Sequence, residues 1–405
     1  MKALRTCAGG LVLLSAAVTQ ACSGGSSGSS GETGGEGGFG SSSMMSLGSQ
    51  PGAAGGAAGA SVSAVGGQSS GGTGSGAVSG GTSAGGATGR AGMSAAGGSG
   101  GSATGSGGTP GKPGTVGGCS VFTADDDWNK DISSATVDAT WTMHVQTVLS
   151  SGLHLHPDYG NSGTEHYGIP INVVPQSQPA VKVTFDDYPD ESDPGPYPFP
   201  DPGTAKIEGG TPMDCSGDCH FLTVQSGTCM LYEGYGCSYS SGWHCANGAK
   251  WDLTKKSYGQ RPKGWTSADA AGLAIMPGLV RLDEVRAGAI THAIRFTMDC
   301  SRPNFVAPAT HQAVPGSCDP NNPNSPPMGL RVRLNKTKFD ISKLSASAQV
   351  VAKAMQTYGL ILADNGSDFY FQGEDNPGWT EQDVEPLKTI PAAAFEVITP
   401  PPLEH

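Results

Sequence analysis

The chain has 405 residues, of which 64 are glycine, and its formal net charge at pH 7 is −12. Glycine accounts for 37 of the 96 residues from 23 to 118, a segment with a single aromatic residue and no three-residue glycine period. Such a segment cannot bury enough apolar surface to fold, which excludes both a folded first third and a collagen helix. The acidic charge argues against nucleic acid and anionic lipid as partners.

The first 22 residues have the order of a secretory signal peptide. Lys2 and Arg5 precede an apolar stretch from 8 to 18, which is too short to span a bilayer. It is followed by Thr19-Gln20-Ala21-Cys22, which resembles the lipobox of bacterial lipoproteins, with Thr19 where that family usually has leucine. The resemblance implies a lipid on Cys22 and membrane contact only through this lipid; the alternative is an ordinary signal peptide cleaved nearby. Both interpretations predict export to the cell envelope, the outer surface or the medium.

Residues 23–118 are predicted to form a disordered linker, and residues 119–405 a single globular domain. The domain carries 33 acidic and 19 basic residues, a net charge of −14. Its even number of cysteines predicts up to four disulfides in an exported protein. These cysteines are Cys119, Cys215, Cys219, Cys229, Cys237, Cys245, Cys300 and Cys318. A zinc site between 215 and 245 is the alternative, but the spacing fits no usual zinc motif. We expect no cofactor, and a structural calcium ion is left open.

The domain is predicted to be mainly β. Short alternating apolar runs, which are typical of strands, occur at 181–185, 220–224, 230–232, 290–298 and 330–334. Two segments with helical spacing follow the N-cap residues Asp138 and Ser345, and Gly359 would end the second. An Asn-Gly pair at 365–366 between two apolar runs predicts a β-hairpin. These elements predict a two-sheet β-sandwich or jelly roll with a few short helices and long loops.

Three carboxylates are candidates for acid–base catalysis. Asp218 and His220 alternate along a predicted strand, so they point to one face. Glu233 ends an apolar strand, where burial can raise the pKa of a carboxyl group and make it a general acid; the alternative is a solvent-facing charge or a partner for arginine. Asp269 lies among small residues that would let a bulky ligand approach. Its alternative is the first turn of a helix capped by Ser267.

His292 and Arg295 lie on opposite faces of a predicted strand. His292 shares an apolar face with Ile294 and Phe296, where a hydrogen-bonded core histidine is the common outcome and a catalytic base is the alternative. Arg295 could neutralise a carboxylate, either of a substrate or of Glu233.

Two further groups of residues could bind a ligand. His154, His156 and Asp158 alternate in a pattern that could hold a metal, but a polar loop entering a strand is favoured, so we expect no metal ligand. Aromatic side chains are dense from Tyr232 to Trp265. If they are exposed, the rings of Trp243, Trp265 and Tyr232 would stack on the apolar faces of sugars. If they are buried, they would pack in the core.

Several segments together resemble an uncharacterised family of exported bacterial proteins. They are SADAAGL (267–273), PGLVR (277–281), HAIRFT (292–297), PPMGLRVRL (326–334) and ADNGS (363–367). The resemblance covers most of 119–405, departs from the family pattern at Cys219, where arginine is expected, and implies one domain but no activity.

The sequence therefore predicts a surface-tethered enzyme that acts on a polysaccharide or another extracellular glycan. A glycoside hydrolase is the leading hypothesis, with Glu233 as the acid and Asp269 or Asp218 as the second carboxylate. One alternative is a polysaccharide lyase, in which His292 or a tyrosine is the base and Arg295 neutralises a uronate. The other is a non-catalytic carbohydrate-binding or adhesion lipoprotein.

Overall fold

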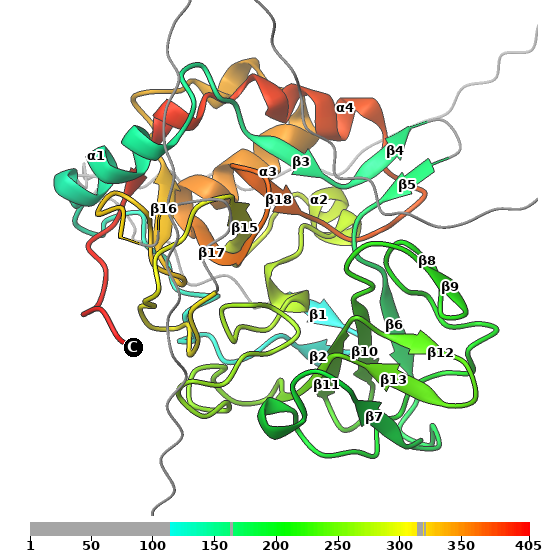
Figure 1. Cartoon of the computed structure of the whole chain (residues 1–405). Coiled ribbons are helices and arrows are strands. Elements are labelled where there is room, and N and C mark those ends of the chain that lie inside the picture. The colour runs from blue at the N-terminus through cyan, green and yellow to red at the C-terminus, as the bar shows by residue number, and fades with distance from the viewer. Residues whose placement is uncertain (1–113, 163–164, 314–318, 320) are drawn as a thin grey trace, which may run out of the picture. The chain divides into compact units, whose positions relative to one another are not determined.

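The computed structural model describes residues 114–162, 165–313, 319 and 321–405, all of which belong to one compact unit of the chain (Figure 1). The predicted signal peptide, Cys22 and almost all of the predicted linker lie outside the described residues. Within them, no helix is long and apolar enough to cross a membrane.

The predicted mainly β fold with a few short helices and long loops is confirmed. The largest sheet has six strands in the order β19-β16-β17-β15-β18-β3. Their bounds are β19 (Phe395–Val397), β16 (Arg331–Leu334), β17 (Leu360–Asn365), β15 (Ile294–Met298), β18 (Tyr370–Gln372) and β3 (His156–Asp158). The sheet is mixed: β15 is parallel to β17 and antiparallel to β18.

The second-largest sheet has four strands in the order β14-β11-β10-β6. These are β14 (Asn247–Asp252), β11 (Met230–Tyr235), β10 (Phe221–Gln225) and β6 (Ile171–Val174). A three-stranded sheet adds β12 (Ser238–Tyr239), β13 (Trp243–Cys245) and β7 (Val183–Phe185). Three short pairs are β1 (Thr115–Val116) with β2 (Cys119–Ser120), β4 (Gly160–Ser162) with β5 (Glu165–Tyr167), and β8 (Gly210–Thr211) with β9 (Asp214–Cys215).

The helices are short, and side-chain caps begin some of them, although α2 begins without one. The α-helices are α1 (Ala139–Val148), α2 (Leu282–Ala287), α3 (Ala346–Thr357) and α4 (Glu381–Val384). The 3₁₀ turns are η1 (Pro189–Glu191), η2 (Met276–Gly278), η3 (Ile341–Lys343), η4 (Glu385–Thr389) and η5 (Ala392–Ala394). Both predicted N-caps are confirmed: Asp138 accepts a hydrogen bond from Trp141 N, and Ser345 accepts one from Ala348 N. α3 packs against β16 (Figure 1).

The predicted hairpin at Asn365-Gly366 is wrong. β17 and β18 flank this turn in sequence, but each pairs with β15, which lies between them. A strand that arrives from about 60 residues earlier in the chain therefore replaces the local pairing that an Asn-Gly turn favours.

Two apolar clusters hold the sheets together. The larger extends from the six-stranded sheet and α3 to one face of the four-stranded sheet, where it includes Leu222 and Leu231. The smaller lies on the opposite face and contains Tyr197, Phe199 and Phe221. Successive residues of β10, Phe221 and Leu222, thus enter different clusters, as the two-residue period of a strand requires.

Disulfides tie the long loops to the sheets. The bonds are Cys119–Cys229, Cys215–Cys219 and Cys237–Cys245, and Cys300 is also disulfide-bonded. The predicted oxidation of these seven cysteines is confirmed, and it leaves no thiolates among them for the alternative zinc site at 215–245; Cys318 lies outside the described residues.

Candidate functional site

A pocket of about 330 Å³ lies where the end of β17 meets the four-stranded sheet and the loop before η2. Tyr188, Asp218, Tyr235, Asn247, His311 and Asp364 are among its lining residues. With Asn365, which also lines it, the pocket combines two carboxyl groups, two tyrosines, two amides and an imidazole.

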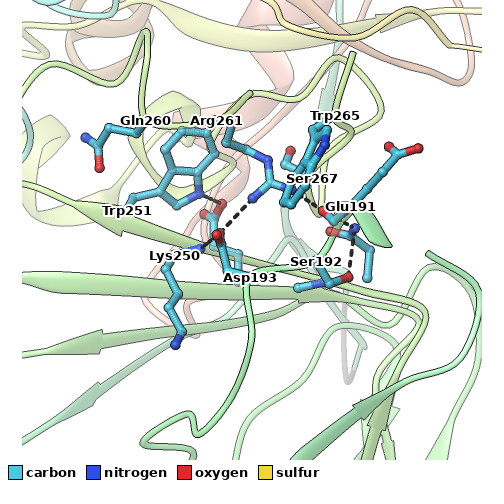
Figure 2. A network of polar contacts seen from close by, with 12 residues as sticks. Glu191, Ser192, Asp193, Lys250, Trp251, Gln260, Arg261, Trp265 and Ser267 are labelled. Atoms are coloured by element: carbon cyan, nitrogen blue, oxygen red, sulfur yellow. Dashed lines mark hydrogen bonds and ion pairs between the residues drawn. The ribbon is translucent and has the colours of Figure 1, made fainter. Parts of the chain in front are cut away.

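Two loops that line the pocket are joined by Arg261, whose side chain is buried (Figure 2). Arg261 Nη1 donates to Asp193 Oδ2 at 2.8 Å, in the loop after η1, and Nε donates to Thr266 O at 2.7 Å. Thr266 N in turn donates to Glu191 Oε2 at 2.8 Å. A planar guanidinium that bonds two loops at once restrains both, so the pocket walls are preorganised.

Asn247, at the start of β14, connects the same loop to the floor of the pocket. Its Nδ2 donates to Glu191 O and to Ser192 Oγ, both at 3.2 Å, and Ser192 Oγ also accepts from Gly248 N at 3.1 Å. Asn247 Oδ1 is buried and has no hydrogen-bond partner in the described part of the chain. It is an acceptor that a ligand hydroxyl would satisfy.

The hydrogen bond of His311 defines which of its ring nitrogens carries the proton. His311 Nδ1 lies 2.8 Å from Ala270 O. A carbonyl oxygen only accepts, so Nδ1 carries the proton, and in the neutral ring Nε2 is then an acceptor.

The Cys215–Cys219 disulfide closes the turn that carries Asp218. Cys219 adopts a φ of 51°, a left-handed conformation that a non-glycine residue seldom adopts, and Asp218 is exposed at the pocket. The turn is further anchored because Gly236 N donates to Asp218 O at 3.0 Å. A short covalent loop thus fixes the backbone that carries one of the two carboxylates.

Asp364, at the end of β17, is the second carboxyl group of the pocket. Its side chain is 24% exposed. Burial, and next the negative charge of Asp269, raise the pKa of Asp364 to about 7, against the opposing effect of Arg295. Burial, with the charges of Asp218 and Asp364, also raises the pKa of Tyr235. Both carboxyl groups are therefore within electrostatic range of Tyr235, and at neutral pH Asp364 carries a proton for a large fraction of the time.

Beneath the pocket, Asp269 and Arg295 form a buried two-point ion pair. Arg295 Nε donates to Asp269 Oδ2 at 3.0 Å and Nη2 donates to Oδ1 at 2.7 Å; Asp364 Oδ2 lies 3.7 Å from Nη2. Burial opposes the charge of Arg295, but these carboxylates hold its pKa above the usual range. The predicted pairing of Arg295 with Glu233 is therefore wrong, because its partners are Asp269 and Asp364. The predicted helix at Asp269 is also wrong: Asp269 lies in a turn, where Ser267 Oγ accepts a hydrogen bond from Asp269 N.

A second pair, formed by the buried His220 and the partly exposed Glu208, is coupled electrostatically to this one. His220 Nδ1 is 2.5 Å from Glu208 Oε2. Burial lowers the pKa of His220, but the Glu208 carboxylate outweighs burial and raises it to about 9. Arg295 and Asp364 also act electrostatically on His220, which shows that the two pairs and Asp364 form one network.

Glu233, the predicted general acid, lies elsewhere. It is 0% exposed, and its oxygens accept from Trp251 Nε1 at 2.9 Å, Ile275 N at 3.0 Å and Met276 N at 2.9 Å. Burial raises its pKa to about 7, as the sequence predicts, but Glu233 lies within β11, which continues to Tyr235, and not at the end of the strand. Both of its carboxyl oxygens are engaged by these donors, and Glu233 is not among the residues that line the pocket, so this position suits a brace between β11 and η2 and not a general acid.

His292 is placed as a core histidine. It is 1% exposed, with Nε2 3.0 Å from Glu284 Oε2 and Nδ1 2.7 Å from Ala293 O. Glu284 also bonds the buried Arg281. Both ring nitrogens are engaged, so the arrangement does not supply the base of the lyase alternative.

The three aromatic residues that were predicted to stack on sugars lie in different environments. Trp243 is 3% exposed and stacks on Phe221 with ring centroids 4.7 Å apart, so it belongs to the smaller apolar cluster. Tyr232 is half-buried against Tyr197. Trp265 is half-exposed, and its ring centroid lies 5.5 Å from the Arg261 guanidinium carbon.

Sequence reasoning missed Asp364, Asn247 and His311. Asp364 stands in an Asp-Asn-Gly-Ser run that is typical of turns, which concealed its position at the end of a buried strand. Among the residues that the structure describes, no three His, Cys, Asp or Glu side chains are grouped as a metal site requires.

Comparison of the chain with models of protein families, with curated proteins and with solved structures finds no match. The functional interpretation therefore depends on the geometry of the pocket.

Proposed function

We propose that this chain is a glycoside hydrolase in which Asp364 is the general acid and Asp218 the second carboxylate. The observation that carries the proposal is that one pocket holds a partly exposed carboxyl group with a pKa of about 7 and an exposed carboxylate. Glycoside hydrolysis needs this pair, one group protonated and the other charged.

In this mechanism Asp364 donates its proton to the oxygen of the leaving sugar. Asp218 either attacks the anomeric carbon or removes a proton from the attacking water, and the anomeric configuration of the first product distinguishes the two. Asn247 Oδ1 and His311 Nε2 accept hydrogen bonds from sugar hydroxyls, while Tyr188 and Tyr235 contact the sugar ring. The Arg295–Asp269 pair positions Asp364 and keeps its pKa near neutrality, since the two neighbours act on it with opposite signs.

We further propose that the protein works outside the cytoplasm, tethered through a lipid on Cys22 and the glycine-rich linker. The disulfides support an oxidising compartment. Phase separation in detergent tests the tether: we expect the full chain to enter the detergent phase and the Cys22→Ser variant to remain in the aqueous phase.

The test of activity is release of new reducing ends from a panel of plant, fungal and bacterial polysaccharides by the full chain. We expect Asp364→Asn and Asp218→Asn each to lower turnover by a factor of about 10² or more, while Asp214→Asn, which removes an exposed charge outside the pocket, leaves it unchanged. Full turnover by both pocket variants would refute the assignment. Ultraviolet-absorbing products would indicate a lyase. Binding of a polysaccharide without release of new reducing ends would indicate a binding module.

A further inference from the structure

A second pocket, of about 440 Å³, lies between β3, β4 and the α4–η4 segment. His156, Asp158, Tyr159, Asn161, Glu381 and Lys388 are among its lining residues. It shares no residue with the candidate catalytic pocket. Figure 1 shows β3, the edge strand of the six-stranded sheet, and β4, of the two-stranded sheet, beside α4.

Buried polar atoms around this pocket lack partners. Tyr159 is 3% exposed, and its hydroxyl has no hydrogen-bond partner among the described residues. The same holds for Asn161 Oδ1, although Asn161 Nδ2 donates to Pro377 O and Trp379 O. Buried polar groups are normally satisfied, so two unsatisfied oxygens on one pocket indicate a ligand that completes them.

The charges of the pocket favour a cation. Asp158, Glu381 and Glu385 supply three carboxylates against the single ammonium of Lys388, which is already bonded to Glu385 at 2.6 Å. His156 stacks on Tyr370 with centroids 3.9 Å apart, and burial lowers its pKa, so it adds no positive charge at neutral pH. The pocket therefore has more acceptors than donors and a net negative charge.

We propose that this pocket binds a small polar organic cation that carries a primary ammonium group beside hydroxyl groups, the chemistry of an amino sugar. The ammonium donates to Asp158 and Glu381, and the hydroxyls bond Tyr159 Oη and Asn161 Oδ1. A bare metal ion fits less well, because these side chains form no metal-type group in the described part of the chain. The site shares no lining residue with the proposed catalytic pocket and does not depend on its carboxylates, but Asp158 is within electrostatic range of Glu208 and Arg295.

Isothermal titration of the full chain with glucosamine, and with glucose as the uncharged probe of the same size, tests the proposal. We expect glucosamine to bind at least tenfold more tightly than glucose at low ionic strength. Asp158→Asn and Glu381→Gln should each weaken glucosamine at least fivefold, and Tyr159→Phe, which removes one hydroxyl, should weaken both probes. Asp214→Asn is the control for net charge and should bind as the unmodified chain does.

Glu381 is exposed, so its variant keeps the test valid if Asp158→Asn fails to fold. Equal affinity for the two probes, no detectable glucosamine binding, or unchanged glucosamine affinity in Glu381→Gln would overturn the proposal. Asp364→Asn should leave glucosamine binding unchanged, which separates this site from the proposed active site.

Discussion

Breaking the buried Asp269–Arg295 pair should destabilise the protein strongly, and Asp269→Asn measures the cost of leaving Arg295 without this partner. Arg295 is 2% exposed and Asp269 is 0% exposed, and two hydrogen bonds of 3.0 and 2.7 Å join them. Removing one partner of a buried pair leaves an uncompensated charge and typically lowers the free energy of unfolding by about 3–5 kcal/mol. Asp364, 3.7 Å from Arg295 Nη2, can ionise and compensate in part, so we expect a loss near the lower end, about 3 kcal/mol.

Urea unfolding at pH 7 is the assay. For a domain of this size, a loss of about 3 kcal/mol corresponds to a fall of about 1 M in the urea midpoint. The matched control is Glu385→Gln, which breaks the exposed Lys388–Glu385 pair and should lower the free energy of unfolding by less than about 1 kcal/mol. The double variant Asp269→Asn/Arg295→Met should regain stability, because no buried charge is left unpaired. A loss below 1 kcal/mol for the single variant, or a double variant less stable than the single, would refute the reasoning.

Two other properties of the structure can be checked in the same way. His220 has a folded pKa of about 9, above its unfolded value of about 6.5, so its contribution to stability is complete below pH 6.5 and is lost as the pH rises through 9. Thermal melting from pH 6 to 10 should show this decline in the melting temperature. The same decline with pH in His220→Gln would contradict the explanation. The Cys119–Cys229 disulfide joins residues 110 apart, and replacing both by serine should lower the free energy of unfolding by about 2–5 kcal/mol. Guanidinium unfolding should show a smaller loss for serine at Cys215 and Cys219, which are only four residues apart; the reverse order would count against this explanation.

Features that depend on local chemistry were predictable from the sequence. The caps at Asp138 and Ser345 depend on residues within three positions, and the strand predicted at 220–224 is found at Phe221–Gln225. The hairpin at Asn365-Gly366 failed because its outcome depends on β15, a strand distant in sequence.

The candidate site was harder to predict because the burial of each side chain decides whether it can contact a ligand. Glu233 and Asp218 are both carboxylates near β10 and β11, yet one is fully buried under three donors and the other is exposed at a pocket. Trp243 likewise packs in a cluster although its sequence context suits a surface ring. Single-sequence patterns specify which face of a strand a side chain occupies, but not which faces become covered.

The pH dependence of kcat/KM for release of reducing ends tests the central claim most directly. If Asp364 is the general acid, activity falls as the pH rises through about 7, the pKa to which burial raises this group. Asp269→Asn removes a neighbouring negative charge and should move this limb to lower pH, while Asp364→Asn removes it together with most of the activity. A descending limb that keeps its position and amplitude in Asp364→Asn would contradict the account.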